Sequence, residues 1–68
     1  KAARFYKMAS DQGNPYAMNN YGFMLSNGVG LKVDKESAAK YFKLAADHGN
    51  KDAMINYGNM RIRLISPI

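Results

Sequence analysis

The chain lacks the residues and segments on which several classes of protein depend. Its 68 residues include no cysteine, which excludes a disulfide framework, a thiolate metal site and a cysteine nucleophile. That absence agrees with a reducing compartment such as the cytoplasm. No apolar run approaches the roughly 20 residues of a membrane-spanning helix, and no signal-peptide pattern opens the chain. The sequence begins at Lys1 rather than at a methionine, so we expect it to be a piece of a longer protein.

Polar groups that could act together in catalysis are also missing. The five acidic residues are scattered at expected helix caps and helix ends, where they form neither a carboxylate pair nor a metal cluster. The single histidine, His48, lies at an expected helix C-terminus, where an imidazole interacts favourably with the helix dipole. We therefore predict no catalytic residue, no cofactor and no metal, and we expect His48 to cap its helix.

Positive charge, in contrast, is in excess. Ten lysines and arginines stand against five acids, for a net charge of +5, which raises the question of a nucleic-acid partner. The basic residues do not form one run, and many fall on the polar sides of expected helices. This pattern is typical of solvated helix faces.

The clearest helix in the sequence extends from Asp34 to Gly49. Asp34 is a good N-cap because its carboxylate can accept from the free N–H groups of the first turn. Gly49 can end the helix in the left-handed conformation. Glu36 precedes Lys40 by four residues, the favourable order for an ion pair. A broad apolar stripe at helical spacing comprises Ala38, Tyr41, Phe42, Ala45 and Ala46.

The chain repeats itself at an offset of 36 residues. Thirteen of the first 24 residues are identical to the residue 36 positions later. A fixed period in this range marks a stacked array of repeats. We therefore predict an all-α fold, an α/α solenoid (a superhelical array of antiparallel helix pairs) represented by about two repeats.

This period divides the chain into three parts. Residues 1–13 are the second helix of a partial repeat, 14–49 are a complete helix–loop–helix repeat, and 50–68 are the first helix of a further repeat. From Arg61 onward the last part departs from the pattern, and Pro67 should stop any helix close to residue 65.

The first helix of the complete repeat has its own start signal and its own packing signal. Asn14 is the expected N-cap, Pro15 occupies the first helical position, and the helix should extend to about Ser26. A mid-helix glycine costs about 1 kcal/mol relative to alanine, and it occurs twice, at Gly22 and Gly58. The recurrence predicts that a paired helix approaches closely at both positions.

The combined signature resembles the Sel-one-like repeat family, the short relatives of tetratricopeptide repeats. No single part of the signature is specific, but together its residues are, and the full copy covers 17–50. The positions that carry it are Tyr21, Gly22, Gly28, Gly30, Asp34, Ala38, Tyr41, Phe42, Ala45, Ala46 and Gly49. The resemblance implies a non-catalytic scaffold or adaptor, stacked on neighbouring repeats of a longer array, that binds a protein or peptide on its concave face.

In such arrays the first helix of each pair lines the concave surface. Its apolar tyrosines and methionines are expected in the core, which leaves a set of side chains to contact a partner. These candidate partner-binding residues are Asn19, Asn20, Phe23, Asn56 and Asn59, with Ser26 beside them. Asn20 recurs as Asn56 in the repeat, and an amide can both donate to and accept from an extended peptide backbone. The alternative is that the asparagines bond locally or face water.

A second reading of the same architecture is an RNA-binding repeat. Pentatricopeptide arrays are also paired helices, and they read single-stranded RNA one base per repeat. The basic balance would suit that function, whereas the 36-residue spacing and the glycine-rich loop between the helices favour the Sel-one-like reading.

Overall fold

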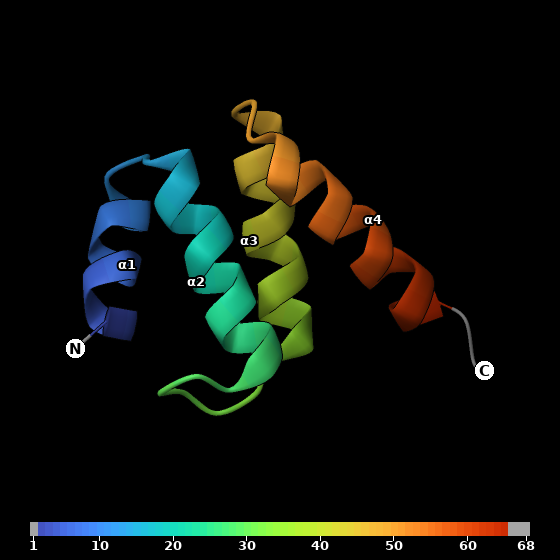
Figure 1. The fold of residues 1–68 in the computed structure, drawn as a ribbon, viewed down its shortest axis with the longest axis horizontal. Coiled ribbons are helices and arrows are strands. Elements are labelled where there is room, and N and C mark those ends of the chain that lie inside the picture. Colours follow the sequence, from blue (N-terminus) through green and yellow to red (C-terminus); the bar gives the residue numbers. More distant parts are fainter. Residues whose placement is uncertain (1, 66–68) are drawn as a thin grey trace.

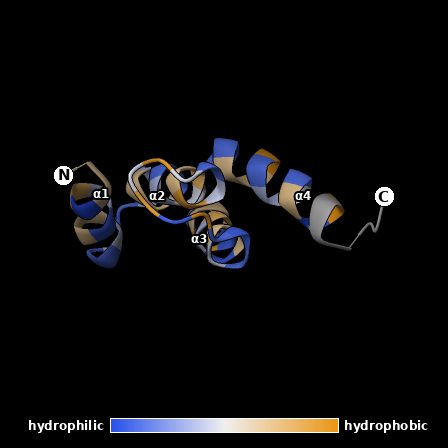
Figure 2. Ribbon diagram, turned by 90° about the horizontal axis from the view of Figure 1, so that it is seen from below, coloured by the Kyte–Doolittle hydropathy of each residue, from blue (hydrophilic) through white to orange (hydrophobic). Residues whose placement is uncertain are grey.

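The computed structural model describes residues 2–65, with the side chains of 2–62. It contains four helices, α1 (Ala2–Asp11), α2 (Pro15–Asn27), α3 (Lys35–Asp47) and α4 (Lys51–Ile65), and no strand among the described residues (Figure 1). Each helix packs against the next one in the chain. When the molecule is turned by 90° from the view of Figure 1, α3 lies below α2 and α4 in the picture (Figure 2). The predicted all-α helical repeat is therefore confirmed.

The helix starts predicted at Asn14 and Asp34 are present, and Asn50, the counterpart of Asn14 in the repeat, caps α4 in the same way. In each case a side-chain oxygen accepts from the backbone N–H three residues ahead. The N···O distances are 3.1 Å at Asn14, 3.0 Å at Asp34 and 2.8 Å at Asn50. Pro15 occupies the first turn of α2, as expected. These caps satisfy N–H groups that have no partner inside the helix.

The helix ends also follow the sequence. Gly49 follows α3 with φ +95°, and its repeat counterpart Gly13 follows α1 with φ +93°, a region that glycine enters without steric cost. Helix α4 is different. It continues to Ile65, through positions where the repeat calls for the glycine-rich loop that follows α2, and Pro67 lies outside the described residues.

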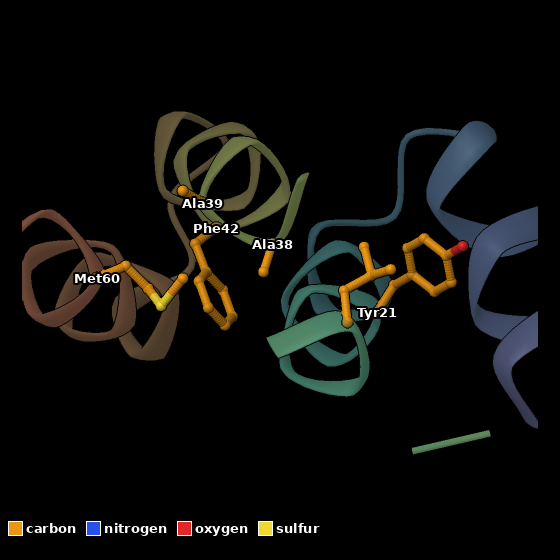
Figure 3. Close-up of a cluster of buried hydrophobic side chains, with 6 residues drawn as sticks. Tyr21, Ala38, Ala39, Phe42 and Met60 are labelled. Carbon is orange, nitrogen blue, oxygen red and sulfur yellow. The ribbon is translucent and has the colours of Figure 1, made fainter. Parts of the chain in front are cut away.

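The core forms where α2 and α3 meet. The ring centroids of Tyr21 and Tyr41 are 4.8 Å apart in an edge-to-face arrangement. Phe42 is 3% exposed and lies between α2 and α4 (Figure 3). The largest buried cluster consists of Tyr21, Leu25, Ala38, Ala39, Phe42 and Met60, and a smaller one of Met18, Ala45 and Ala53. The predicted stripe of α3 is therefore the packed face, although Tyr41 and Ala46 remain half-buried.

The two mid-helix glycines have different surroundings. A β-carbon at Gly22 would lie 2.9 Å from two ring carbons of Phe42 and 3.2 Å from the carbonyl oxygen of Ala38. The predicted close approach at Gly22 is therefore confirmed. At Gly58 a β-carbon would have no neighbour within 4 Å among the described residues, because no helix packs there as α3 packs on α2. The same expectation for Gly58 is thus wrong within the described chain.

The expected ion pair between Glu36 and Lys40 does not form. The ion pairs between described side chains are instead Lys7–Asp11 and Lys43–Asp47, both with an N···O distance of 3.2 Å. They occupy equivalent positions of the repeat and are more than half exposed, so they contribute little to stability. On α3, two oppositely charged side chains four residues apart do form an ion pair, as the spacing predicted, but they are Lys43 and Asp47 and not Glu36 and Lys40.

A matched pair of leucine substitutions tests the contact at Gly22. Gly22→Leu should lower the free energy of unfolding by about 1–3 kcal/mol, because it overpacks the contact with Phe42. Gly58→Leu should leave the stability unchanged or raise it by up to about 1 kcal/mol, since leucine favours helix and the site is open. Urea unfolding of the dilute chain followed by circular dichroism measures both. Equal losses for the two variants would contradict the close approach.

The cap of α3 predicts a dependence of stability on pH. Hydrogen bonds from the backbone N–H and the hydroxyl of Ser37 lower the pKa of Asp34 below its ordinary value of 3.8. A carboxylate with a lowered pKa in the folded state stabilises that state above the ordinary pKa, and this contribution is lost as the pH falls through the folded pKa. Asp34→Asn keeps an accepting oxygen but does not titrate. Its helix content should therefore fall less than that of the unmodified chain below about pH 4, and superimposable acid titrations would rule out a contribution from this cap.

Candidate functional site: a groove between α2 and α4

A hollow of about 220 Å³ lies on the side of the molecule where α2 and α4 are neighbours, and we call it the α2–α4 groove. Helices α2 and α4 each contribute three of the lining residues, and α3 contributes one. The residues that line the groove are Phe23, Ser26, Asn27, Phe42, Asn56, Asn59 and Met60. The groove therefore joins the first helix of one pair to the first helix of the next.

Three apolar side chains give the groove its shape. Phe42 and Met60 belong to the buried core, so they form a fixed apolar floor. The hydroxyl of Ser26 donates to the sulfur of Met60 at 3.8 Å, which links α2 to α4 next to that floor. Phe23 is 53% exposed, and its ring is available at the edge. A ligand side chain could thus bury apolar surface here without any rearrangement of the core.

Two asparagines at the edge are oriented by hydrogen bonds. The Nδ2 group of Asn27 donates to the backbone oxygen of Phe23 at 2.9 Å. The Nδ2 group of Asn56 donates to Oδ1 of Asn19 at 3.0 Å. Because each amide nitrogen is engaged, and no hydrogen bond to either Oδ1 atom is present among the described residues, both amides offer a carbonyl oxygen to a ligand.

The structure brings together three of the five candidate partner-binding residues. Phe23, Asn56 and Asn59 line the groove. Asn20 is half-buried on α2 and does not contribute to the lining. Asn19 is 9% exposed, so the expectation that its side chain is exposed is wrong. It lies on the flank of α2 that α4 covers, and its side chain holds Asn56 in place.

Sequence reasoning missed Asn27 and treated Phe42 only as a core residue. Asn27 was expected in the loop, but α2 continues to it. It lies four residues after Phe23, so the two are on the same face of the helix, and that spacing is the signal that could have found it. No sequence signal marks Phe42 as a groove residue. Its ring belongs to the core and also forms the floor of the groove, and the apolar periodicity of α3 indicates only the core position.

The repeat-signature residues build the helix pair and, apart from Phe42, do not line the groove. They fall into three groups by exposure. The buried ones are Tyr21, Gly22, Ala38, Phe42 and Ala45; the half-buried ones are Gly28, Tyr41 and Ala46; the exposed ones, at turns and at the cap, are Gly30, Asp34 and Gly49. Gly28 and Gly30, in the loop between the helices, have positive φ values of 71° and 70°, which glycine adopts without steric cost.

A second hollow, of about 470 Å³, lies on a different side of the chain. Its lining comes mainly from α1 and α3, the second helices of their pairs: Ser10, Asp11, Gly13, Met18, Lys40, Tyr41 and Leu44. Burial raises the pKa of the Tyr41 hydroxyl in this region, and the bond to Asp11 raises the pKa of Lys7. None of the candidate partner-binding residues lines this hollow.

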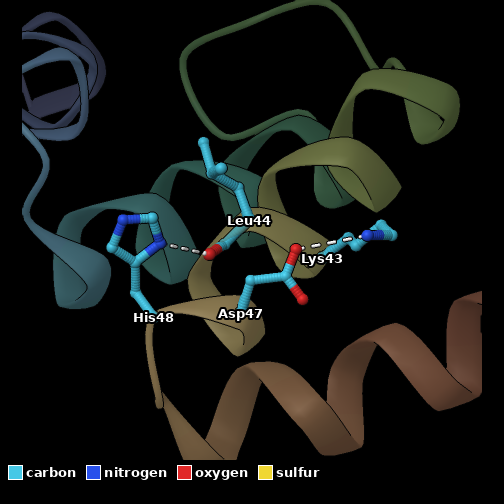
Figure 4. Close-up of polar contacts among 4 residues, drawn as sticks. All are labelled: Lys43, Leu44, Asp47 and His48. Atoms are coloured by element: carbon cyan, nitrogen blue, oxygen red, sulfur yellow. Dashed lines mark hydrogen bonds and ion pairs between the residues drawn. The ribbon is translucent and has the colours of Figure 1, made fainter.

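His48 has the structural role that its position predicts. Its Nδ1 atom lies 2.9 Å from the backbone oxygen of Leu44, beside the Lys43–Asp47 ion pair (Figure 4). The imidazole thus adds a second contact to a carbonyl in the last turn of α3 that also accepts the backbone N–H of His48 at 3.2 Å. Within the described part of the chain, acidic and histidine side chains nowhere gather in a group of three that could hold a metal. None of the helices described is long and apolar enough to cross a membrane.

Comparison with protein families agrees with this architecture. The model of the Sel1 repeat matches residues 1–14 and 15–50. The chain belongs to the Sel1 repeat family. The second match contains α2 and α3 in full, together with the glycine-rich loop between them. Repeats of this family generally mediate protein–protein interactions and are typically non-catalytic, so the partners to consider for a Sel1 repeat chain are proteins. No curated protein and no solved structure matches the chain significantly.

Proposed function

We propose that the chain is a non-catalytic scaffold that binds an extended segment of a partner protein in the α2–α4 groove. The observation that carries this proposal is the convergence of Phe23, Asn56 and Asn59 on one hollow with an apolar floor. We take 14–49 as a complete repeat, 1–13 as the second helix of the repeat before it, and 50–68 as the start of the next, so the groove joins two repeats.

An extended peptide matches the chemistry of this groove. Its backbone presents N–H groups that need acceptors, and the free oxygens of Asn27 and Asn56 supply them. An apolar side chain of the peptide can rest on Phe42 and Met60, beside the exposed ring of Phe23. Asn20, one repeat before Asn56, would contact the same segment farther along the array.

The charges of the groove favour a protein over RNA. None of the lining residues is charged, so a ligand bound there gains little from phosphate contacts. Two of the lysines, Lys7 and Lys43, are already paired with Asp11 and Asp47. Binding in the groove should therefore depend weakly on salt, whereas electrostatic binding to RNA falls steeply with salt.

Titration of a selected peptide tests the proposal. Peptides are selected on the chain from a random display library, and the best binder is titrated against variants by fluorescence anisotropy. Asn59→Ala and Phe23→Ala remove exposed side chains of the groove without emptying the core. Each should weaken binding by about 1–3 kcal/mol, as expected for the loss of an aromatic contact or of a desolvated hydrogen bond.

Lys40→Ala and Lys43→Ala on α3 are the matched controls, and both should bind like the unmodified chain. Asn56→Ala should also weaken binding, but it leaves the buried oxygen of Asn19 without a donor, so its stability must be measured as well. Loss of binding in the lysine variants, with binding retained in the groove variants, would contradict the proposal. That result would favour a basic outer surface for an acidic protein or for RNA.

A further inference from the structure

The hollow between α1 and α3, which we call the α1–α3 hollow, plays no part in the binding of a peptide by the α2–α4 groove. The residues that line it lie between positions 10 and 44, so both of its walls, α1 and α3, are present in the described chain. Its volume of about 470 Å³ falls within the range of roughly 300–1,000 Å³ that is common for small-molecule sites, whereas the groove, with about 220 Å³, falls below it. The hollow is therefore large enough to hold a small molecule.

The apolar part of the hollow is fixed by the core. Met18 is 3% exposed and belongs to the smaller buried cluster, and Tyr41 packs against the same cluster. The edge-to-face contact with Tyr21 also holds the Tyr41 ring in place. Leu44 lines the hollow from α3 and is 42% exposed. An apolar ligand could cover these side chains and release water from them without a rearrangement of the helices.

Two hydroxyl groups in the lining are free to bind a ligand. Ser10 is 4% exposed and Tyr41 is half-buried, and neither hydroxyl forms a hydrogen bond among the described residues. Every side-chain nitrogen or oxygen that is sealed from solvent has a partner in that part of the chain. The Ser10 hydroxyl must therefore reach open space, and the hollow is the space that Ser10 lines. Burial raises the pKa of the Tyr41 hydroxyl, so it stays protonated at neutral pH and can donate.

The charges around the hollow favour an anion. Lys40 lines the hollow and takes part in neither of the ion pairs between described side chains. The carboxylate of Asp11 lines it too, but it is already paired with Lys7 at 3.2 Å. The three groups together carry one net positive charge. A carboxylate in the hollow could thus pair with Lys40 and accept from a hydroxyl, and such charge-assisted hydrogen bonds are stronger than neutral ones.

We propose that the α1–α3 hollow binds a small carboxylic acid with an apolar body. The body rests on Met18, Leu44 and the ring of Tyr41, and the carboxylate lies beside Lys40 and the Tyr41 hydroxyl. The volume of the hollow and the two free hydroxyls argue for a small molecule, and the unpaired lysine argues for its negative charge. The hollow and the α2–α4 groove share no lining residue, so this site does not depend on the proposed peptide site.

Titration of the isotope-labelled chain with octanoate, followed by amide NMR, tests the proposal. Octanol and octylammonium are the matched probes, because they carry the same apolar chain with no charge and with a positive charge. All three are kept below the concentrations at which they form micelles. Octanoate should shift the amide signals of Ser10, Gly13 and Leu44 and leave those of Phe23 and Asn59 in place. Octanol should bind more weakly, and octylammonium should bind most weakly.

Substitutions on α3 test the two polar contacts. Lys40→Gln should weaken octanoate binding by about 3-fold and leave octanol binding unchanged. Lys35→Gln removes the same charge from the same helix outside the hollow, and it should bind octanoate like the unmodified chain. Tyr41→Phe removes only a hydroxyl and should weaken octanoate binding by about 5-fold, with unchanged helix content by circular dichroism.

Several results would overturn the proposal. These are the absence of octanoate-induced shifts around the hollow, octylammonium that binds as tightly as octanoate, and equal octanoate binding by the Lys40→Gln and Lys35→Gln variants. A capped Leu-Glu dipeptide that binds the hollow more tightly than octanoate would also overturn it, because it would assign the hollow to side chains of a partner protein. Shifts confined to the α2–α4 groove would show that octanoate binds at the peptide site and that the hollow is not a separate one.

Discussion

Helices α2 and α3 meet at Gly22, where the ring of Phe42 occupies the space that a β-carbon would need. Ala38 and Ala45 are fully buried on the same side of α3, and their small side chains let the two backbones approach. Such close packing is sensitive to added volume, because protein interiors have few voids to absorb it. The other face of Phe42 is reached by Met60 of α4. The ring of Phe42 on α3 is therefore packed against both α2 and α4.

The candidate binding site is a consequence of that contact. Once Phe42 and Met60 are fixed, the edges of α2 and α4 stand on either side of them, and the amides of Asn27 and Asn56 are held at the rim by hydrogen bonds. The side chains that line the site are apolar or uncharged polar groups.

Local signals in the sequence were sufficient for most of the fold. The caps at Asn14, Asp34 and Asn50 and the glycine after α3 follow from chemistry within a few residues, and the 36-residue period supplied the order of the helices. The exposure of Asn19 could not be read in this way, because it depends on the neighbouring α4 and not on the periodicity of α2. Its counterpart in the repeat, Ile55, is apolar, so comparison of the two repeats did not indicate that Asn19 forms a buried polar contact. The prediction of a close helix approach at Gly58 was wrong for a related reason, because the described chain contains no helix that packs there.

Native-state hydrogen exchange of the dilute chain tests most directly whether the contact between α2 and α3 supports the rest of the structure. Residues in cooperative units exchange at similar rates, and those at the least stable edges exchange first. The amides around Gly22 and Phe42 should be the slowest and should exchange together, while those of α1 and of α4 exchange earlier. If the amides of α1 or α4 were protected as long as those of α2 and α3, or longer, the contact at Gly22 would not be the one on which the fold depends.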